Sequence, residues 1–198
     1  MNFSQPTQLQ PAPQANRYLT LSVEKDPNGL NLHPARIEPK AGRYLTFNLG
    51  HESYGLPILH VRQIIRLCPI TPVPNMPSHV KGVINFRGMV LAVLDLRAKF
   101  GITHEKYGER ACIIILRPGG TSDRGTPIAV IVDAVEEVVQ LHESEIEPAP
   151  DFGGAPNTQY ISGVATIGNG VKTLLHIDKI LQEEGTLNLA LPNAPKTA

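Results

Sequence analysis

Residues 81–100 read KGVINFRGMVLAVLDLRAKF, and residues 162–181 read SGVATIGNGVKTLLHIDKIL. Each stretch begins as a β-rich run, turns at a glycine, returns through a second apolar run and ends in a short helical pattern. An offset of 81 residues superimposes the two stretches. Internal repeats define an architecture before any single element does. The sequence therefore predicts two copies of one β-hairpin, each followed by a short helix.

A second alignment extends the repeat toward the N-terminus. With an offset of 74 residues, 54–58 matches 128–132, and 61–65 matches 135–139. Each repeat is roughly 60–70 residues long, which suits a small closed barrel, because closure removes exposed sheet edges. We therefore expect an all-β fold of two five-stranded barrels in tandem, with units at about 43–100 and 111–181.

Short β-rich segments separated by glycine breaks run from residue 43 onward, which is typical of all-β proteins. Asp95 and Asp178 are expected to cap short helical turns, which Gly101 and Gly185 would end. Strands are expected at 43–49, 53–59, 61–67, 83–86, 89–94, 111–116, 127–132, 134–140, 161–167 and 171–176.

The first 40 residues differ in composition from the rest. They hold six of the 18 prolines and four glutamines but few large apolar side chains. Such a segment buries too little apolar surface to offset its ordering entropy, so we expect a flexible extension at 1–40. Within it, 17–23 nearly duplicates the expected first strand, and the copy either adds to a sheet edge or stays unpaired. The domain itself is expected at 41–184, followed by a tail at 185–198.

Composition indicates a soluble cytoplasmic protein. No apolar run approaches the ~18–20 residues of a membrane span, and the N-terminus has no secretory signal pattern. Cys68 and Cys112 form no CxxC motif, which argues against a disulfide scaffold or a structural zinc site. Eighteen basic residues balance 18 acidic ones, so the electrostatic signature of a nucleic-acid binder is missing.

The zero net charge hides an asymmetry along the chain. Residues 43–117 carry a net charge of +6, and residues 118–198 carry −7. Two halves of opposite charge can steer a partner or favour head-to-tail stacking. Ordinary solvated charge that is unevenly spread along the chain would give the same net charges.

Catalytic motifs are missing from the sequence. It contains no P-loop, dinucleotide-binding glycine motif, zinc-protease motif or EF-hand loop. The seven histidines form no i,i+4 pair. Glu136 and Glu137 could form a cation patch or an acid–base pair, or simply a solvated strand face. We expect no enzymatic activity, no cofactor and no metal.

Seven stretches follow one another in an order that is specific to one family. They are YGLPILHVRQI (54–64), ITPVPNMP (70–77), VKGVINFRG (80–88), VLDLRAKFG (93–101), IVDAV (131–135), IEPAP (146–150) and YISGV (160–164). In these stretches the sequence resembles the CheW family, the adaptors of bacterial chemotaxis arrays. The resemblance covers residues 43 to about 184 and implies two intertwined SH3-like β-barrels.

The resemblance also implies a function in signal transduction by a two-component system. Members are non-catalytic scaffolds that couple the cytoplasmic tips of methyl-accepting chemoreceptors to the regulatory domain of the histidine kinase CheA. Other CheW-like modules could join them in rings. The protein would be cytoplasmic and recruited to membrane-associated receptor arrays, without membrane insertion. An adaptor of a paralogous kinase pathway, with pili, surface motility or another output, remains the alternative.

The resemblance carries over seven receptor- or kinase-binding positions. They are Val61, Gln63, Gly82, Asn85, Arg87, Gly88 and Val138. Arg87 is expected at a hairpin tip, where its planar guanidinium could bind a carboxylate or backbone carbonyls, or be only a surface cation. Gln63 stands where an acidic residue is usual, and Phe86 stands where leucine is common. The N-terminal extension has no counterpart in the family.

Overall fold

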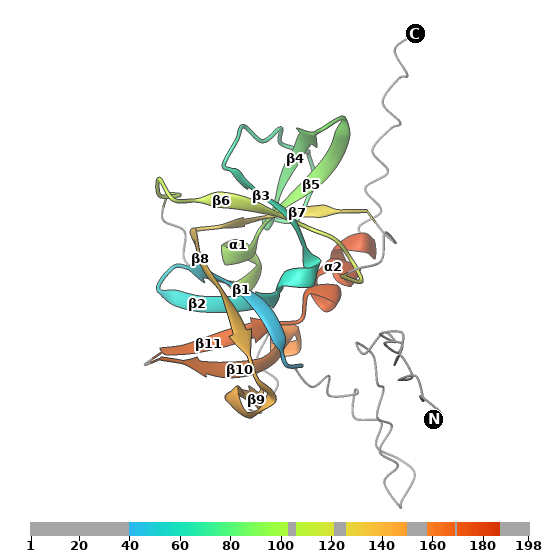
Figure 1. Cartoon of the computed structure of the whole chain (residues 1–198). Helices are drawn as coiled ribbons and strands as arrows, with labels where there is room; N and C mark the ends of the chain where they lie inside the picture. The colour runs from blue at the N-terminus through green and yellow to red at the C-terminus, as the bar shows by residue number, and fades with distance from the viewer. Residues whose placement is uncertain (1–39, 103–105, 121–125, 150–157, 169, 187–198) are drawn as a thin grey trace, which may run out of the picture. The chain divides into compact units, whose positions relative to one another are not determined.

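The computed structural model describes residues 40–102, 106–120, 126–149, 158–168 and 170–186 (Figure 1). The expected extension with its strand copy at 17–23, and most of the expected tail, lie outside the described residues. In chain order the elements are β1 (Gly42–Leu49), β2 (Glu52–Pro57), η1 (Ile58–His60), β3 (Val61–Arg66), β4 (Val80–Phe86), β5 (Met89–Asp95), α1 (Leu96–Phe100), β6 (Cys112–Leu116), β7 (Ile128–Val132), β8 (Ala134–Leu141), η2 (Glu143–Glu145), β9 (Ile146–Pro148), η3 (Thr158–Tyr160), β10 (Ile161–Ile167), β11 (Gly170–Leu175) and α2 (Ile177–Thr186).

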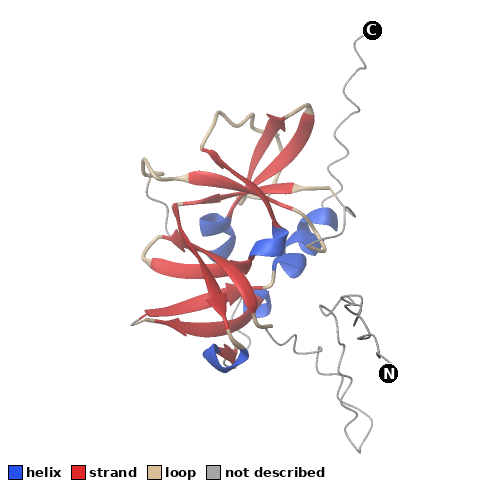
Figure 2. Cartoon of the chain, in the orientation of Figure 1, coloured by secondary structure: helices blue, strands red, loops and turns tan. Residues whose placement is uncertain are grey.

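The strands form two sheets, as Figure 2 shows. The six-stranded sheet has the order β8-β1-β2-β11-β10-β9, and the five-stranded sheet has the order β3-β6-β7-β5-β4. Each sheet contains one parallel pair, β2 with β11 and β5 with β7. The predicted class, all-β with two intertwined SH3-like units and short helical turns, is confirmed. The three-residue strand β9, which the sequence analysis did not predict, is the sixth strand of the larger sheet.

The sequence repeat holds at the level of strand register. Strands β8, β1, β2, β11 and β10 occupy the same positions in their sheet as β3, β6, β7, β5 and β4 in the other. Across the parallel pairs, Leu174 faces Gly55 just as Val93 faces Ala129. These four residues are related by the offsets of 81 and 74 found in the sequence. The two sheets are therefore quasi-equivalent copies.

The predicted division into consecutive units at 43–100 and 111–181 is wrong for the sheets. Strands β1 and β2 pair with β8 and β11, whereas β3, β4 and β5 pair with β6 and β7. The crossing occurs at η1, whose three residues lead directly from β2 in one sheet to β3 in the other. An alignment of repeats identifies equivalent strands, but it does not determine which copy each strand pairs with.

One core joins the two sheets. Its fully buried side chains include Phe47 and Leu56 from the six-stranded sheet, Ile114 from the five-stranded sheet, and Leu96 and Ile180 from the two helices. Burying one such side chain contributes about 1.5–3 kcal/mol, so apolar contact between the sheets is a main source of stability.

Helix α1 begins and ends as the sequence predicts. The Asp95 carboxylate accepts hydrogen bonds from the amides of Arg97 and Ala98, which are the unpaired donors of a helix start. Gly101 adopts a left-handed conformation, with φ of 73°, and ends the helix.

The prediction for α2 is wrong at both ends. Its first turn is capped by His176, whose Nδ1 lies 3.3 Å from the amide of Lys179. Asp178 lies inside that first turn, and Gly185 lies within the helix instead of ending it. The imidazole nitrogen thus supplies the acceptor that an aspartate provides in α1.

Candidate binding surfaces

The hairpin between β4 and β5 presents a strained arginine at its tip. Phe86 pairs with Met89, which leaves Arg87 and Gly88 as a two-residue loop. Both loop residues have positive φ, 51° and 82°, as the type I′ hairpin turn requires. A side chain other than glycine costs about 1 kcal/mol in this conformation, and such strain concentrates at functional sites.

The neighbouring residues fix this tip. The side-chain oxygen of Asn85 accepts a hydrogen bond from the amide of Gly88 at 3.0 Å. The guanidinium of Arg87 lies 5.1 Å from the ring centre of the buried Phe86, close enough for a cation–π contact, while Arg87 itself is exposed. The equivalent hairpin between β10 and β11 has Gly168, with φ of 60°, at the position of Arg87. The turn therefore does not need an arginine.

Gly82 lies in β4 but is buried. It has a φ of 137°, and a β-carbon there would lie 2.0 Å from the carbonyl oxygen of Thr71. Thr71 and Val83 exchange two backbone hydrogen bonds of 2.9 Å, which bring the connection between β3 and β4 onto this strand. The geometry gives Gly82 a packing role beneath this connection, because it offers no surface to a partner.

The three remaining predicted residues lie on edge strands of the two sheets. Val61 and Gln63, both half-buried, belong to β3, and Val61 packs against the shared core. Val138 belongs to β8 and has 48% of its surface exposed. The structure thus brings Asn85, Arg87 and Gly88 together at one tip and places the other contact positions on separate strands.

Exposed apolar side chains occur in equivalent pairs. The large exposed apolar residues among the described part of the chain are Ile64, Val90, Val138 and Val171. Ile64 aligns with Val138 in the repeat, and Val90 aligns with Val171. The sequence analysis named only Val138. The 74-residue offset could have identified Ile64, because it relates these two positions.

The charge asymmetry of the sequence appears on these equivalent edge strands. Around Ile64, β3 exposes Arg62 and Arg66, whereas β8 exposes Glu136 and Glu137 beside Val138. One edge is therefore apolar and basic, and its counterpart is apolar and acidic.

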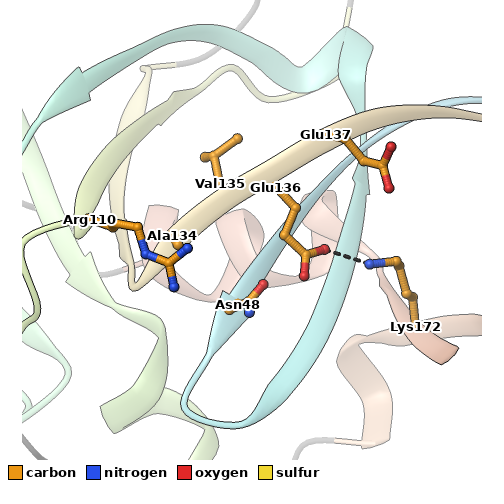
Figure 3. Close-up of a pocket in the computed structure, with 7 residues that line it drawn as sticks. All are labelled: Asn48, Arg110, Ala134, Val135, Glu136, Glu137 and Lys172. Atoms are coloured by element: carbon orange, nitrogen blue, oxygen red, sulfur yellow. Dashed lines mark hydrogen bonds and ion pairs between the residues drawn. The ribbon is translucent and has the colours of Figure 1, made fainter.

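A polar pocket of about 460 Å³ lies along β8 (Figure 3). Within it, Lys172 donates hydrogen bonds to Glu136 and, at 2.9 Å, to the hydroxyl of Ser53. Burial alone would raise the pKa of Glu136, but hydrogen bonds from Lys172, Ser53 and Thr46 outweigh it and lower that pKa. The lining residues are Asn48, Arg110, Ala134, Val135, Glu136, Glu137 and Lys172. None of the seven predicted binding residues lines this pocket, and Glu136 is paired instead of forming a simple solvated face.

The described residues contain no cluster of three or more histidine, cysteine, aspartate or glutamate side chains that could hold a metal. In the same part of the chain, no helix has the length and apolar character needed to cross a membrane.

Comparisons with known proteins agree with this architecture. The CheW-like domain profile matches residues 43–185. The chemotaxis protein CheW of Klebsiella aerogenes is 35% identical over 141 residues, which cover 71% of this chain and 82% of that protein. Protein FrzA of Myxococcus xanthus is 30% identical over 142 residues, covering 70% and 84%. The crystal structure of the scaffolding protein TtCheW from Thermoanaerobacter tengcongensis is similar with a TM-score of 0.62 at 30% identity, covering 73% of this chain and 90% of that one. This chain belongs to the CheW-like family.

Proposed function

We propose that this protein is a non-catalytic adaptor that couples chemoreceptor cytoplasmic tips to the histidine kinase CheA in chemotaxis signalling. Family membership supports the proposal, since relatives are named as a chemotaxis protein and a scaffolding protein. The adaptor acts in the cytoplasm and is recruited to receptor arrays at the membrane. It needs no catalytic group, because its output is the simultaneous occupation of two surfaces.

The β4–β5 hairpin tip is the observation that carries the proposal. A solvent-exposed Arg87 is held in a conformation that the equivalent hairpin achieves with glycine. The strain therefore serves the side chain and not the turn. A guanidinium fork on a fixed backbone suits a carboxylate or the carbonyl groups at a helix end. Together with the apolar edge position Val138, this tip forms the proposed receptor-binding surface.

The kinase contact is assigned to an edge of the five-stranded sheet. Edge strands present unpaired backbone donors and acceptors that another β-domain can match. The CheA regulatory domain is itself CheW-like, so it offers an edge of the same kind. The opposite net charges of residues 43–117 and 118–198 would favour contact with a further CheW-like module in a ring.

Calorimetry on the full chain tests the proposal. The protein is titrated with the CheA regulatory domain and, separately, with a receptor-tip fragment. We expect micromolar binding to both, with receptor binding lost in Arg87→Ala and kept in the matched control Arg43→Ala, which removes an exposed arginine from β1. Circular dichroism verifies that both variants are folded. A folded Arg87→Ala variant that binds the receptor normally would remove the tip from the site.

The choice of receptor decides between chemotaxis and another output. One relative, Protein FrzA, is not named as a chemotaxis protein. Titration with tip fragments from a taxis receptor and from a pilus-pathway receptor separates the two, because an adaptor of a paralogous kinase pathway prefers the second fragment.

A further inference from the structure

Charged side chains are buried where the two sheets meet. Asp95 is fully buried, and its Oδ1 accepts a hydrogen bond of 2.9 Å from the amide of Arg97. Its Oδ2 accepts one of 2.6 Å from the Tyr107 hydroxyl and lies 3.6 Å from Lys81 Nζ. Asp95 thus connects β4, the strand that leads to the hairpin tip, to the first turn of α1.

The next contact crosses from one sheet to the other. Arg97 has 5% of its surface exposed, and its Nε lies 3.3 Å from Asp133 Oδ1. Asp133 directly precedes β8, and its Oδ2 accepts a hydrogen bond of 2.6 Å from the amide of Gly50, in the turn between β1 and β2. Arg97 follows β5 of the five-stranded sheet, and Gly50 lies in a turn of the six-stranded sheet. Asp133 is the single residue between β7 of the five-stranded sheet and β8 of the six-stranded sheet, and its carboxylate contacts both Arg97 and Gly50. The ion pair therefore joins the two sheets.

The other half of the repeat has a related contact built differently. Gly119 follows β6, the strand equivalent to β1, which Gly50 follows. The Gly119 amide donates a hydrogen bond of 2.8 Å to Asp178 Oδ1. Asp178 in turn aligns with Arg97 through the 81-residue offset. In both halves a glycine amide at the sheet boundary meets a carboxylate. Arg97 contacts the carboxylate of Asp133, whereas the carboxylate of Asp178 lies 3.8 Å from His60 Nδ1.

The physical properties of these contacts suggest a division of roles. Apolar burial stabilises the association of the sheets but has no directional preference. A buried ion pair gains little net stability, because desolvation offsets its attraction, but its geometry is specific. Resting on the proposed function, we propose that Arg97 is a positioning residue. Its pair with Asp133 sets the orientation of the sheets, so that one receptor fragment contacts both the Arg87 tip and Val138.

Two substitutions in the full chain test this role. Arg97→Gln removes the cation, and Asp133→Asn removes the facing charge while keeping an oxygen for the Gly50 amide. The second variant serves if the first one fails to fold. We expect each folded variant to bind the receptor-tip fragment roughly tenfold more weakly. Binding of the CheA regulatory domain, which is assigned to one sheet, should stay within about twofold.

A matched control separates positioning from general loss of stability. Val93→Ala opens a cavity in a core cluster of the five-stranded sheet that contains neither Arg97 nor Asp133, and urea titration shows how far the free energy of unfolding falls. The proposal is overturned if receptor affinity is unchanged in both Arg97→Gln and Asp133→Asn. It is also overturned if Val93→Ala weakens receptor binding equally at a comparable free energy of unfolding.

Hydrogen exchange distinguishes this inference from the proposed function. In Arg97→Gln and Asp133→Asn, we expect faster exchange of the Gly50 amide and unchanged exchange in β6 and β7. If the wild-type chain binds neither fragment, the proposed function fails, and the exchange rates still decide whether the ion pair holds the sheets together. Unchanged exchange at Gly50 in both variants would show that it does not.

Discussion

Replacing Gly82 with alanine should break the contact between β4 and the connection that precedes it. The new β-carbon would lie 2.0 Å from the Thr71 carbonyl oxygen and 2.9 Å from Pro72 Cα, so this backbone must move. Movement breaks the two hydrogen bonds between Thr71 and Val83, each worth about 0.5–1.5 kcal/mol. The positive φ adds about 1 kcal/mol of strain for alanine. Together, the free energy of unfolding should fall by about 2–4 kcal/mol.

Urea unfolding followed by circular dichroism measures this loss. The matched control is Gly88→Ala, since Gly88 also has a positive φ but has no atom within 4 Å of its β-carbon position. Only the conformational strain of about 1 kcal/mol applies there. If Gly82→Ala destabilises no more than Gly88→Ala, the close approach of Thr71 does not constrain the fold, and the packing role assigned to Gly82 is wrong.

Three further substitutions probe polar groups. Asp95→Ala removes the α1 cap and the carboxylate that accepts the hydrogen bond of the Tyr107 hydroxyl. Urea titration should therefore show a free energy of unfolding that is lower by about 2–4 kcal/mol. Burial lowers the pKa of His176 below its usual value of about 6.5. The free energy of unfolding should therefore decline as the pH falls from 7.5 through 6.5, and His176→Asn should flatten this decline. Parallel plots of the free energy of unfolding against pH for wild type and variant would refute this. Lys172→Met should lower the free energy of unfolding by roughly 1 kcal/mol at pH 7, where Glu136 is ionised, and this loss should shrink as the pH falls through the lowered pKa of Glu136. A loss that does not change with pH would contradict the ion pair.

Periodicity and the repeat predicted most of the fold. They located ten of the strands because apolar alternation and glycine breaks are local signals. They did not predict β9, because a strand of three residues is too short to show an alternation of apolar and polar side chains. The intertwined pairing could not follow from the repeat either, because quasi-equivalent strands compete for the same partners. At α2, an aspartate before an apolar run suggested a cap, but the imidazole of His176, two residues before Asp178, takes that role.

The candidate site was less predictable than the fold. The stretch VKGVINFRG (80–88) located Asn85, Arg87 and Gly88, but only the backbone angles show that Arg87 is strained at a position where glycine would be unstrained. Gly82 was grouped with them by resemblance, yet it is buried beneath Thr71 and Pro72, eleven and ten positions earlier, a contact that no local pattern encodes. The partner of Arg97 lies in the other sheet, so the Asp-Leu-Arg string gave no indication of its role.

The crossing at η1 has a consequence for the order of events during protein synthesis. Among the described strands, β1 and β2 leave the ribosome first, but their sheet partners, β8 and β11, are made much later. Until then the apolar side chains of Phe47 and Leu56 have no core to enter, and the outer edges of both strands remain unpaired. Folding that depends on such distant pairings is slow, and exposed strands of this kind favour aggregation or chaperone binding. Among the described strands, the first hairpin to be made is therefore the one that stays unprotected longest.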